Sequence, residues 1–296
     1  MPSAELERYK KILAEAVLPE DATMAERRAS YDELGDAFPG DETVAAERAA
    51  LGGVPGWRFD PPNADPERAI LYFHGGGYAM GSTKSHIMIV TRLAAAAGCR
   101  LHFPEYRLAP EHLFPAAIDD CVEAYRALSQ EVGESVRIAV AGDSAGGGLV
   151  FAVMLRLRDE GLPLPACAVA ISPWCDMEGQ GTWRAGDPNR DVFLSVEELE
   201  AFVETYLNGE NLRHPHVAPH YGDLSGLPPV LIQVGDTELL LDDSHALANG
   251  MTTAGGTVVL EIEEGAPHVW HHLAPEVPEA NAALTRAGAF ITQHAG

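Results

Sequence analysis

The pentapeptide Gly142–Gly146 (GDSAG) presents a serine that could act as a nucleophile. It follows the apolar run 136–142 and opens a segment of helical character, GGLVFAVMLRLRDE. A strand that turns sharply into a helix needs small residues beside the turn, and it lifts the turn side chain toward the positive end of the helix dipole. The spacing predicts that Ser144 is a nucleophile, and the alternative without chemistry is a glycine-rich helix start.

A second glycine-rich motif, His74–Gly77 (HGGG), directly follows the apolar run 69–73. Successive glycines allow backbone N–H groups to point into a cavity instead of into a strand ladder. Both motifs follow predicted strands, and ligands bind beyond the carboxyl ends of the strands in open α/β sheets. We therefore predict an oxyanion hole formed by the backbone N–H groups of Gly76, Gly77 and Ala145.

A serine nucleophile needs a histidine base, which in this layout comes after the serine and the acid in the chain. His268 is the strongest candidate because it lies in the loop GAPHVWHH between the last predicted strand and the last predicted helix. His271 and His272 share that loop and are its nearest competitors. The remaining candidates are predicted to be structural or exposed, and they are His214, His216 and His220. No histidine spacing supports a metal site, so no metal and no cofactor are expected.

The acid that orients the base is expected just beyond the predicted strand 229–235. Asp236 and Glu238 both satisfy this position, and the residues alone leave the two as rivals. Asp242 and Asp243 are interpreted as first-turn residues of the next helix, where acidic side chains complement the helix dipole.

Short apolar runs alternate with helical patterns from about residue 69 onward, which predicts an α/β fold with a mostly parallel sheet covered by helices on both faces. The predicted strands are 69–73, 100–103, 136–142, 167–172, 229–235 and 257–262. The predicted helices between and after them are 84–97, 116–131, 145–160, 239–254 and 279–294. Residues 43–51 fit either a helix or the first arm of a hairpin.

Two stretches fall outside this alternation. Residues 1–40 are helical and acidic, and residues 175–220 interrupt the strand–helix pattern with Trp183, a predicted helix at 196–207 and a His/Pro-rich end. Because an insertion between sheet strands usually covers something, we expect the two stretches to pack together as a lid.

The composition excludes several function classes. The chain has 296 residues, 46% of them hydrophobic, and carries 20 Lys+Arg against 44 Asp+Glu for a net charge of −24, which is unfavourable for nucleic acid and for anionic membrane surfaces. No apolar stretch reaches the length of a membrane span, and the first residues lack a signal-peptide layout. The four cysteines show no CxxC spacing and are expected to be reduced and mostly buried, so we predict a cytoplasmic protein.

The blocks HGGGYAMGS, EYRLAPEHLFPAAIDD and GDSAGGG, in this order, resemble those of the bacterial hormone-sensitive lipase family of carboxylesterases within the α/β-hydrolase fold. The resemblance covers about residues 40–296. It implies a mostly parallel sheet of about eight strands with a helical cap, in which 1–40 form the N-terminal part of the cap and 41–296 the catalytic domain with a cap insertion at about 175–220. It also implies that residues 43–51 form an edge strand.

The resemblance implies a catalytic triad of Ser144, Glu238 and His268. Glu238 is favoured over Asp236 because the family places its acid two residues before a leucine, although many members have Asp-Pro-Leu where this chain has Glu238-Leu239-Leu240. By the same resemblance His74 shapes the oxyanion loop, Asp143 braces the turn at the nucleophile, and Glu105–Glu111 support the wall of the active site.

These inferences predict a serine carboxylesterase that cleaves small-molecule esters with short acyl chains, with Trp183 and Phe193 near the pocket. Amide, lactone or carbamate hydrolysis would use the same groups. A hormone-binding relative of this fold without catalysis, such as the plant gibberellin receptors, would have a broken triad. The resemblance also makes a homodimer plausible by analogy.

Overall fold

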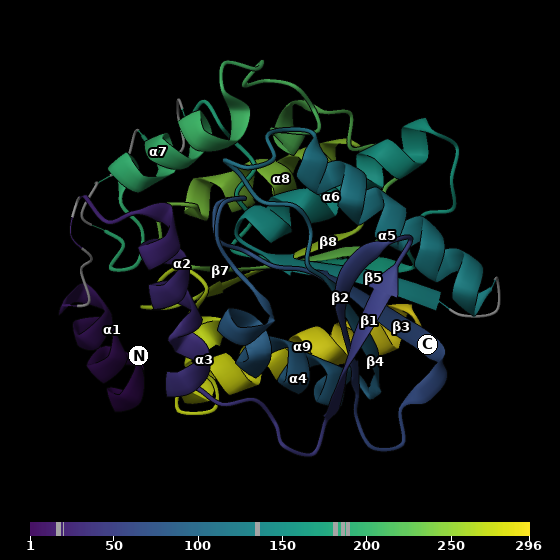
Figure 1. Ribbon diagram of the computed structural model, residues 1–296, viewed down its shortest axis with the longest axis horizontal. Helices are drawn as coiled ribbons and strands as arrows, with labels where there is room; N and C mark the ends of the chain where they lie inside the picture. The colour runs from purple at the N-terminus through teal and green to yellow at the C-terminus, as the bar shows by residue number, and fades with distance from the viewer. Residues whose placement is uncertain (16–18, 20, 134–136, 180–182, 185–186, 188–189) are drawn as a thin grey trace.

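The computed structural model describes residues 1–15, 19, 21–133, 137–179, 183–184, 187 and 190–296. Within this part of the chain, eight strands form one sheet (Figure 1). The strands are β1 (Ala45–Leu51), β2 (Val54–Asp60), β3 (Asp65–Phe73), β4 (Cys99–Pro104), β5 (Arg137–Asp143), β6 (Cys167–Ile171), β7 (Val230–Gly235) and β8 (Val258–Glu263).

The strands follow the order β1-β2-β4-β3-β5-β6-β7-β8. β2 runs antiparallel to both of its neighbours, and every pair from β4 to β8 is parallel. Because parallel strands end at the same edge of a sheet, the loops that follow β3, β5, β6, β7 and β8 gather at one edge.

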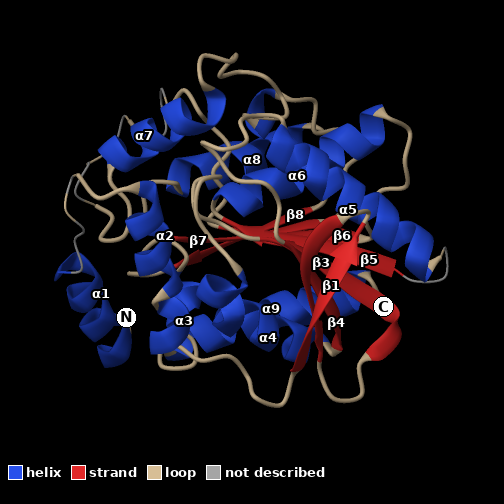
Figure 2. Cartoon of the chain, in the orientation of Figure 1, coloured by secondary structure: helices blue, strands red, loops and turns tan. Residues whose placement is uncertain are grey.

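Helices cover both faces of the sheet (Figure 2). One face carries α4 (Thr83–Ala97) and α9 (Pro278–His294), and the other carries α5 (Ala116–Val132), α6 (Ala145–Asp159) and α8 (Leu241–Thr253). Each layer has its own apolar core. Helix α6 is the most deeply buried helix, because its own residues are apolar or small on every face. The predicted α/β architecture is confirmed.

The predicted elements agree closely with the structure. All six predicted strands are present, although residue 136 of the third lies outside the described residues and β3 begins earlier than predicted, at Asp65. Residues 45–51 form β1 at the sheet edge, which settles the ambiguity in favour of the hairpin. The reversal into β2 uses Gly52 and Gly53, whose φ angles of 59° and 84° match the tight turn that joins twisted antiparallel strands.

The two stretches outside the alternation are largely helical. Residues 1–40 contain α1 (Ala4–Glu15), α2 (Met24–Asp32) and α3 (Leu34–Ala37). The stretch between β6 and β7 contains α7 (Val196–Leu207), with the short helix η1 (Pro219–Tyr221) after it, and η2 (Trp270–Leu273) follows β8. Parts of the predicted lid, residues 16–18, 20, 180–182, 185–186 and 188–189, lie outside the described residues.

Two further expectations concern the cysteines and membrane-spanning segments. All four cysteines are free and buried, as predicted. Of the helices that the structure describes, none combines the length and the apolar character needed to cross a bilayer.

Candidate active site

Ser144 lies at the turn between β5 and α6, in a backbone conformation that side chains rarely adopt. Its φ and ψ are 53° and −120°, and its side chain is 8% exposed. A Cβ atom on Gly142 would come within 2.5 Å of the Gly146 carbonyl oxygen, and one on Gly146 within 2.0 Å of the Phe73 carbonyl oxygen. The two glycines are therefore required by close backbone approach, and the strained turn raises the serine at the first turn of a helix.

The glycine loop, residues 74–82, follows β3 and lies beside this turn. The φ angles of Gly76 and Gly77 are 105° and 61°. Among the described residues, the N–H groups of Gly76, Gly77 and Ala145 donate to no protein acceptor. Free N–H groups beside a serine hydroxyl can stabilise an oxyanion.

The histidine loop, residues 264–273, follows β8 and brings His268 onto Glu238. The Nδ1 atom of His268 lies 2.8 Å from Oε2 of Glu238, and both side chains are buried. The other carboxylate oxygen, Oε1, accepts from the Ser172 hydroxyl at 2.9 Å and from the Gly235 backbone N–H. Glu238 is thus held on both oxygens, which fixes the imidazole ring that it orients.

Burial and the carboxylate act in opposite directions on the pKa of His268. Burial lowers it, but the hydrogen bond and the charge of Glu238 outweigh burial, so the pKa of His268 is raised above its usual 6.5. Burial raises the pKa of Glu238, and the bond to His268 opposes that rise. The pair is therefore built to stabilise a positive charge on the imidazole.

The rival residues have other partners. Asp236 accepts from the Gly265 N–H at 2.7 Å, and among the described residues no hydrogen bond joins its carboxylate to His268. His271 binds the Gln233 side chain through Nε2, and its pKa is lowered by burial to about 3. His214 accepts from the His216 N–H at 3.1 Å and thus has a structural contact, as expected.

One contact of the predicted triad is absent. No hydrogen bond joins the Ser144 hydroxyl to His268 in the part of the chain that the structure describes. The two residues follow the parallel strands β5 and β8 and so lie at the same sheet edge. Catalytic hydrogen bonds often tighten only when substrate is bound.

Asp143, beside the nucleophile, connects the serine turn to the glycine loop. Its buried carboxylate accepts from the Tyr72 hydroxyl at 2.7 Å and from the Gly75 N–H at 3.1 Å, and it lies 3.3 Å from Nε2 of His86. Although burial raises the pKa of Asp143, His86 and the hydrogen-bond donors outweigh this, so its pKa is far below its usual range. The carboxylate is therefore charged and internally paired, which agrees with the bracing role expected of it.

His86, Asp143 and His272 each offer one ligand atom within 4.8 Å of the others, and all three are buried. Two imidazoles and a carboxylate are a donor set that suits a divalent transition metal. These donors already have protein partners, because His86 contacts Asp143 and His272 contacts Tyr31. The sequence spacing gave no sign of this cluster.

Several residues that shape the site were missed by the sequence analysis. Ser172, with φ 44°, contacts both Glu238 and the Val269 N–H, and only its position at the end of the predicted strand 167–172 could have indicated it. Phe202 of α7 packs on Gly77 so closely that a Cβ there would lie 2.5 Å from the ring. Asp191 accepts from the Leu239 N–H at 3.1 Å, next to the acid, and from the Phe193 N–H at 2.9 Å.

Of the two aromatic residues expected near the pocket, Phe193 lies beside His268, and Trp183 packs inside the segment that follows β6. The ring centroid of Phe193 lies 6.2 Å from that of His268. Trp183 is fully buried, packs against Gly179 and donates from its indole N–H to the Asp176 carbonyl at 2.7 Å. Trp183 thus stabilises the segment after β6 by packing on its backbone and bonding to it.

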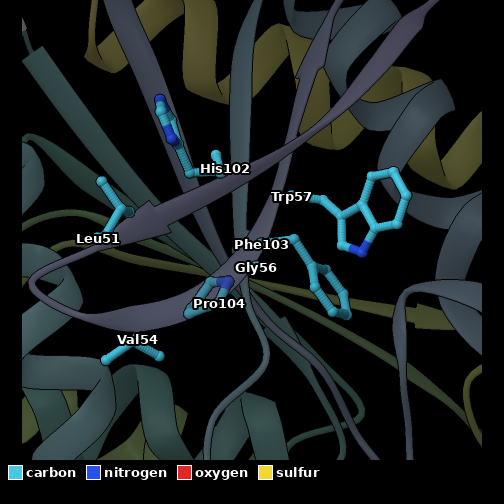
Figure 3. Close-up of a pocket in the computed structure, with 8 residues that line it drawn as sticks. Leu51, Val54, Gly56, Trp57, His102, Phe103 and Pro104 are labelled. Carbon is cyan, nitrogen blue, oxygen red and sulfur yellow. The ribbon is translucent and has the colours of Figure 1, made fainter.

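A pocket lies elsewhere in the molecule, at the corner formed by β1, β2 and β4 (Figure 3). His102 lines it together with apolar residues of the three strands, and no candidate catalytic residue does. Both ring nitrogens of His102 are buried, and neither has a hydrogen-bond partner in the described part of the chain.

Known proteins resemble this chain over its whole length. A family model described as the α/β-hydrolase fold matches residues 70–272. An acetyl-hydrolase of Streptomyces hygroscopicus is 39% identical over an alignment of 302 residues, which covers 100% of this chain and 99% of the relative. An esterase of Acinetobacter venetianus is 32% identical over 266 residues, or 90% of this chain and 88% of the relative.

Solved structures give the same result. An esterase from the bacterial hormone-sensitive lipase family is 41% identical and superposes with a TM-score of 0.96 over 100% of both chains. The structure of EstE5, soaked with p-nitrophenyl butyrate, is 37% identical with a TM-score of 0.94 over 99% of both chains. The chain belongs to the α/β-hydrolase family and, within it, to the bacterial hormone-sensitive lipase family. It is a carboxylic ester hydrolase.

Proposed function

We propose that the chain is a serine carboxylesterase that hydrolyses short-chain acyl esters with Ser144 as nucleophile, His268 as base and Glu238 as the orienting acid. The observation that carries the proposal is the 2.8 Å contact between Nδ1 of His268 and Glu238 at the sheet edge that also bears the strained serine turn. That contact leaves Nε2 of His268 available to take the serine proton.

The reaction proceeds in two halves. The Ser144 oxygen attacks the ester carbonyl while its proton moves to Nε2 of His268, and the negative oxygen that forms is stabilised by the N–H groups of Gly76, Gly77 and Ala145. When the intermediate collapses, the ester C–O bond breaks and the leaving alcohol takes the proton from His268. Water then attacks the acyl-serine, gives its proton to His268, and that proton returns to the Ser144 oxygen as the acid leaves.

We further propose that residues 1–40 and the insertion at about 175–220 form a helical cap over this site, with 41–296 as the catalytic domain. Contacts from both parts support this, because Tyr31 of α2 and Phe193 of the insertion both reach the His272 ring, at centroid distances of 5.8 and 6.4 Å. The packing of Phe202 on Gly77 narrows the space above the glycine loop, which favours short acyl chains. The acetyl-hydrolase and the butyrate-soaked EstE5 are relatives whose names fit this size range.

The test is hydrolysis of p-nitrophenyl butyrate by the wild-type protein and by the Ser144→Ala variant, with EDTA present. We expect turnover in the natural chain and at least a roughly thousandfold lower kcat in Ser144→Ala, because loss of a nucleophile removes most catalysis. Ser225→Ala, at an exposed serine, is the matched control and should keep full activity. Equal rates in both chains would contradict the assignment of Ser144, and faster cleavage of a C12 than a C4 ester would contradict the short-chain preference.

A further inference from the structure

Helix α2 contacts both loops that flank the serine turn. In Figure 1 it lies at the left of the molecule, in the part of the chain that precedes the sheet. The sequence assigns it no chemistry. Three of its side chains, Arg28, Tyr31 and Asp32, nevertheless bond to segments that are more than 49 residues away in the chain.

Arg28 fixes α2 to the glycine loop. Its Nε donates to the Ala79 carbonyl at 2.8 Å, and its Nη2 donates to the Ala109 carbonyl at 2.9 Å. Both of its terminal nitrogens also bind the carboxylate of Glu111 in a bidentate pair. A partly exposed ion pair contributes little by itself, but a planar guanidinium held by Glu111 presents its remaining N–H groups to the loop carbonyls in a fixed direction.

Asp32 adds a second contact at the end of the same loop. Its carboxylate accepts from the Ser82 hydroxyl at 2.6 Å, and Ser82 caps the N-terminus of α4. Both ends of the segment from Ala79 to Ser82 are therefore bonded to α2.

Tyr31 fixes α2 to the histidine loop. Its hydroxyl lies 3.2 Å from Nε2 of His272 and donates to it in the tautomer that carries the proton on Nδ1. Nδ1 of His272 is buried without a partner, so Tyr31 is the sole hydrogen-bond partner of this ring among the described residues. His272 belongs to η2, the turn that follows His268.

These contacts bear on catalysis because the two loops carry different parts of the machinery. The glycine loop supplies two of the three proposed oxyanion donors, and the histidine loop supplies the base. A displacement of about 1 Å between such groups can reduce the rate by about 100-fold. An element that bonds to both loops can hold that distance constant.

We propose that α2 is a strap that holds the glycine loop and the histidine loop in fixed relation, with Arg28 and Tyr31 as its positioning residues. The catalytic part of this inference rests on the proposed function. The mechanical part does not, because it states that release of either end of α2 loosens both loops.

The experiment compares Tyr31→Phe, which cuts the histidine-loop end of α2, with Arg28→Ala/Asp32→Ala, which cuts both contacts at the glycine-loop end, and with the triple variant. Each of the first two variants should lower kcat for p-nitrophenyl butyrate about tenfold with little change in KM, because misplacement affects the transition state more than binding. Since each cut releases the same strap, the triple variant should lose little more than the worse of these two. Independent local effects would multiply to about 100-fold. Arg28→Lys, which keeps the charge and one donor group, should recover part of the rate.

Matched controls use the same segment of the chain. Tyr9→Phe removes a hydroxyl from α1, where the ring packs on Phe38. Asp36→Ala removes an exposed ion pair with Lys84. Both should keep kcat within about twofold, since surface substitutions of this kind have small effects. The melting temperature of every variant is measured, and kcat is compared well below the lowest one.

Hydrogen exchange followed by mass spectrometry tests the strap without activity. Tyr31→Phe should raise exchange in residues 264–273 and also in residues 74–82, although the substitution leaves the contacts between Arg28 and residues 74–82 unchanged. Exchange that rises in the histidine loop alone, or multiplicative kcat losses, would overturn the strap. Absence of Ser144-dependent turnover in the natural chain would instead contradict the proposed function and leave the exchange result to decide the strap.

Discussion

The buried Glu238 carboxylate determines how His268 can carry a proton. Because an imidazole and a carboxylate 2.8 Å apart attract most strongly when the ring is charged, the pair favours the protonated ring and raises the pKa of His268. A base must be neutral to accept the serine proton. The activity is therefore expected to rise with pH and to level off above the raised pKa.

Replacement of Glu238 by Gln tests this arrangement. The amide keeps the shape but removes the charge, so burial then lowers the pKa of His268 and the rising limb of kcat/KM moves to lower pH. The rate should fall by about 10³–10⁴-fold, as expected when the orienting charge is lost. Asp236→Asn, which can still accept from the Gly265 N–H, is the control and should leave both the limb and the rate nearly unchanged. A larger loss in Asp236→Asn would reassign the acid.

The sequence alone could identify Ser144 and His268 as candidates but could not choose between Asp236 and Glu238. The two acids lie two residues apart after the same strand, so no periodicity separates them. The direction of the turn after β7 decides which carboxylate reaches His268, because Glu238 contacts its ring whereas Asp236 bonds to the Gly265 N–H of the same loop. Tyr31 was beyond prediction for a similar reason, because its partner His272 lies 241 residues further along the chain.

At the scale of elements, α7 packs directly on the glycine loop through one aromatic side chain. Its capping box at Ser195 and Glu198 fixes where it begins, and Phe202 lies on Gly77 in the second turn. The size of the acyl group that fits is therefore expected to depend on this one aromatic ring.

Phe202→Ala should shift the enzyme toward longer acyl chains. Removal of the ring opens space beside Gly77, so the ratio of kcat/KM for p-nitrophenyl octanoate to that for the butyrate should rise about tenfold, the effect of a few methylene groups. The ratio is measured alongside Val203→Ala, a truncation of the next residue on α7, which should leave it within about twofold. An unchanged ratio in Phe202→Ala would remove Phe202 from the substrate pocket.

The strands of the sheet were predictable because buried parallel strands are short continuous apolar runs, such as 229–235. The hairpin was harder, since AAERAAL in β1 is rich in residues that favour helices and is mostly exposed. Pairing with β2 along its whole length overrides that preference. The position of α7 over the glycine loop depends on contacts that are distant in the chain, which local patterns do not carry.

At the scale of the whole molecule, buried histidines make stability depend on pH. Burial lowers the pKa of His74, His271 and His272 to about 3 and that of His102 to about 4. The unfolded chain binds protons at these residues near pH 6.5 and the folded chain does not, so stability falls as the pH drops below about 6.5. Two buried acids act in the opposite sense, because burial raises the pKa of Asp243 to about 8 and also raises that of Glu238, but the four histidines outnumber them.

The free energy of unfolding should therefore decrease by several kcal/mol between pH 6.5 and 4.5, since each histidine contributes up to about 1.4 kcal/mol per pH unit. Urea unfolding at pH 7.5, 6.5, 5.5 and 4.5 measures this slope. His102→Leu should reduce this slope by up to about 1.4 kcal/mol per pH unit, the contribution of one proton. The replacement breaks no hydrogen bond of the ring among the described residues, so the fold should be kept. A slope that is unchanged in His102→Leu would show that His102 titrates normally in the folded chain.

The sheet order also has a consequence for the sequence of events in folding. The histidine loop follows β8, which among the described strands is hydrogen-bonded to β7 alone and forms the outer edge of the sheet, whereas the serine turn follows β5 near the centre. Edge strands are held by fewer contacts than central ones and open at lower free energy. The molecule should therefore acquire its fold before it acquires its activity, and on gradual denaturation it should lose activity first, while most of its core is still intact.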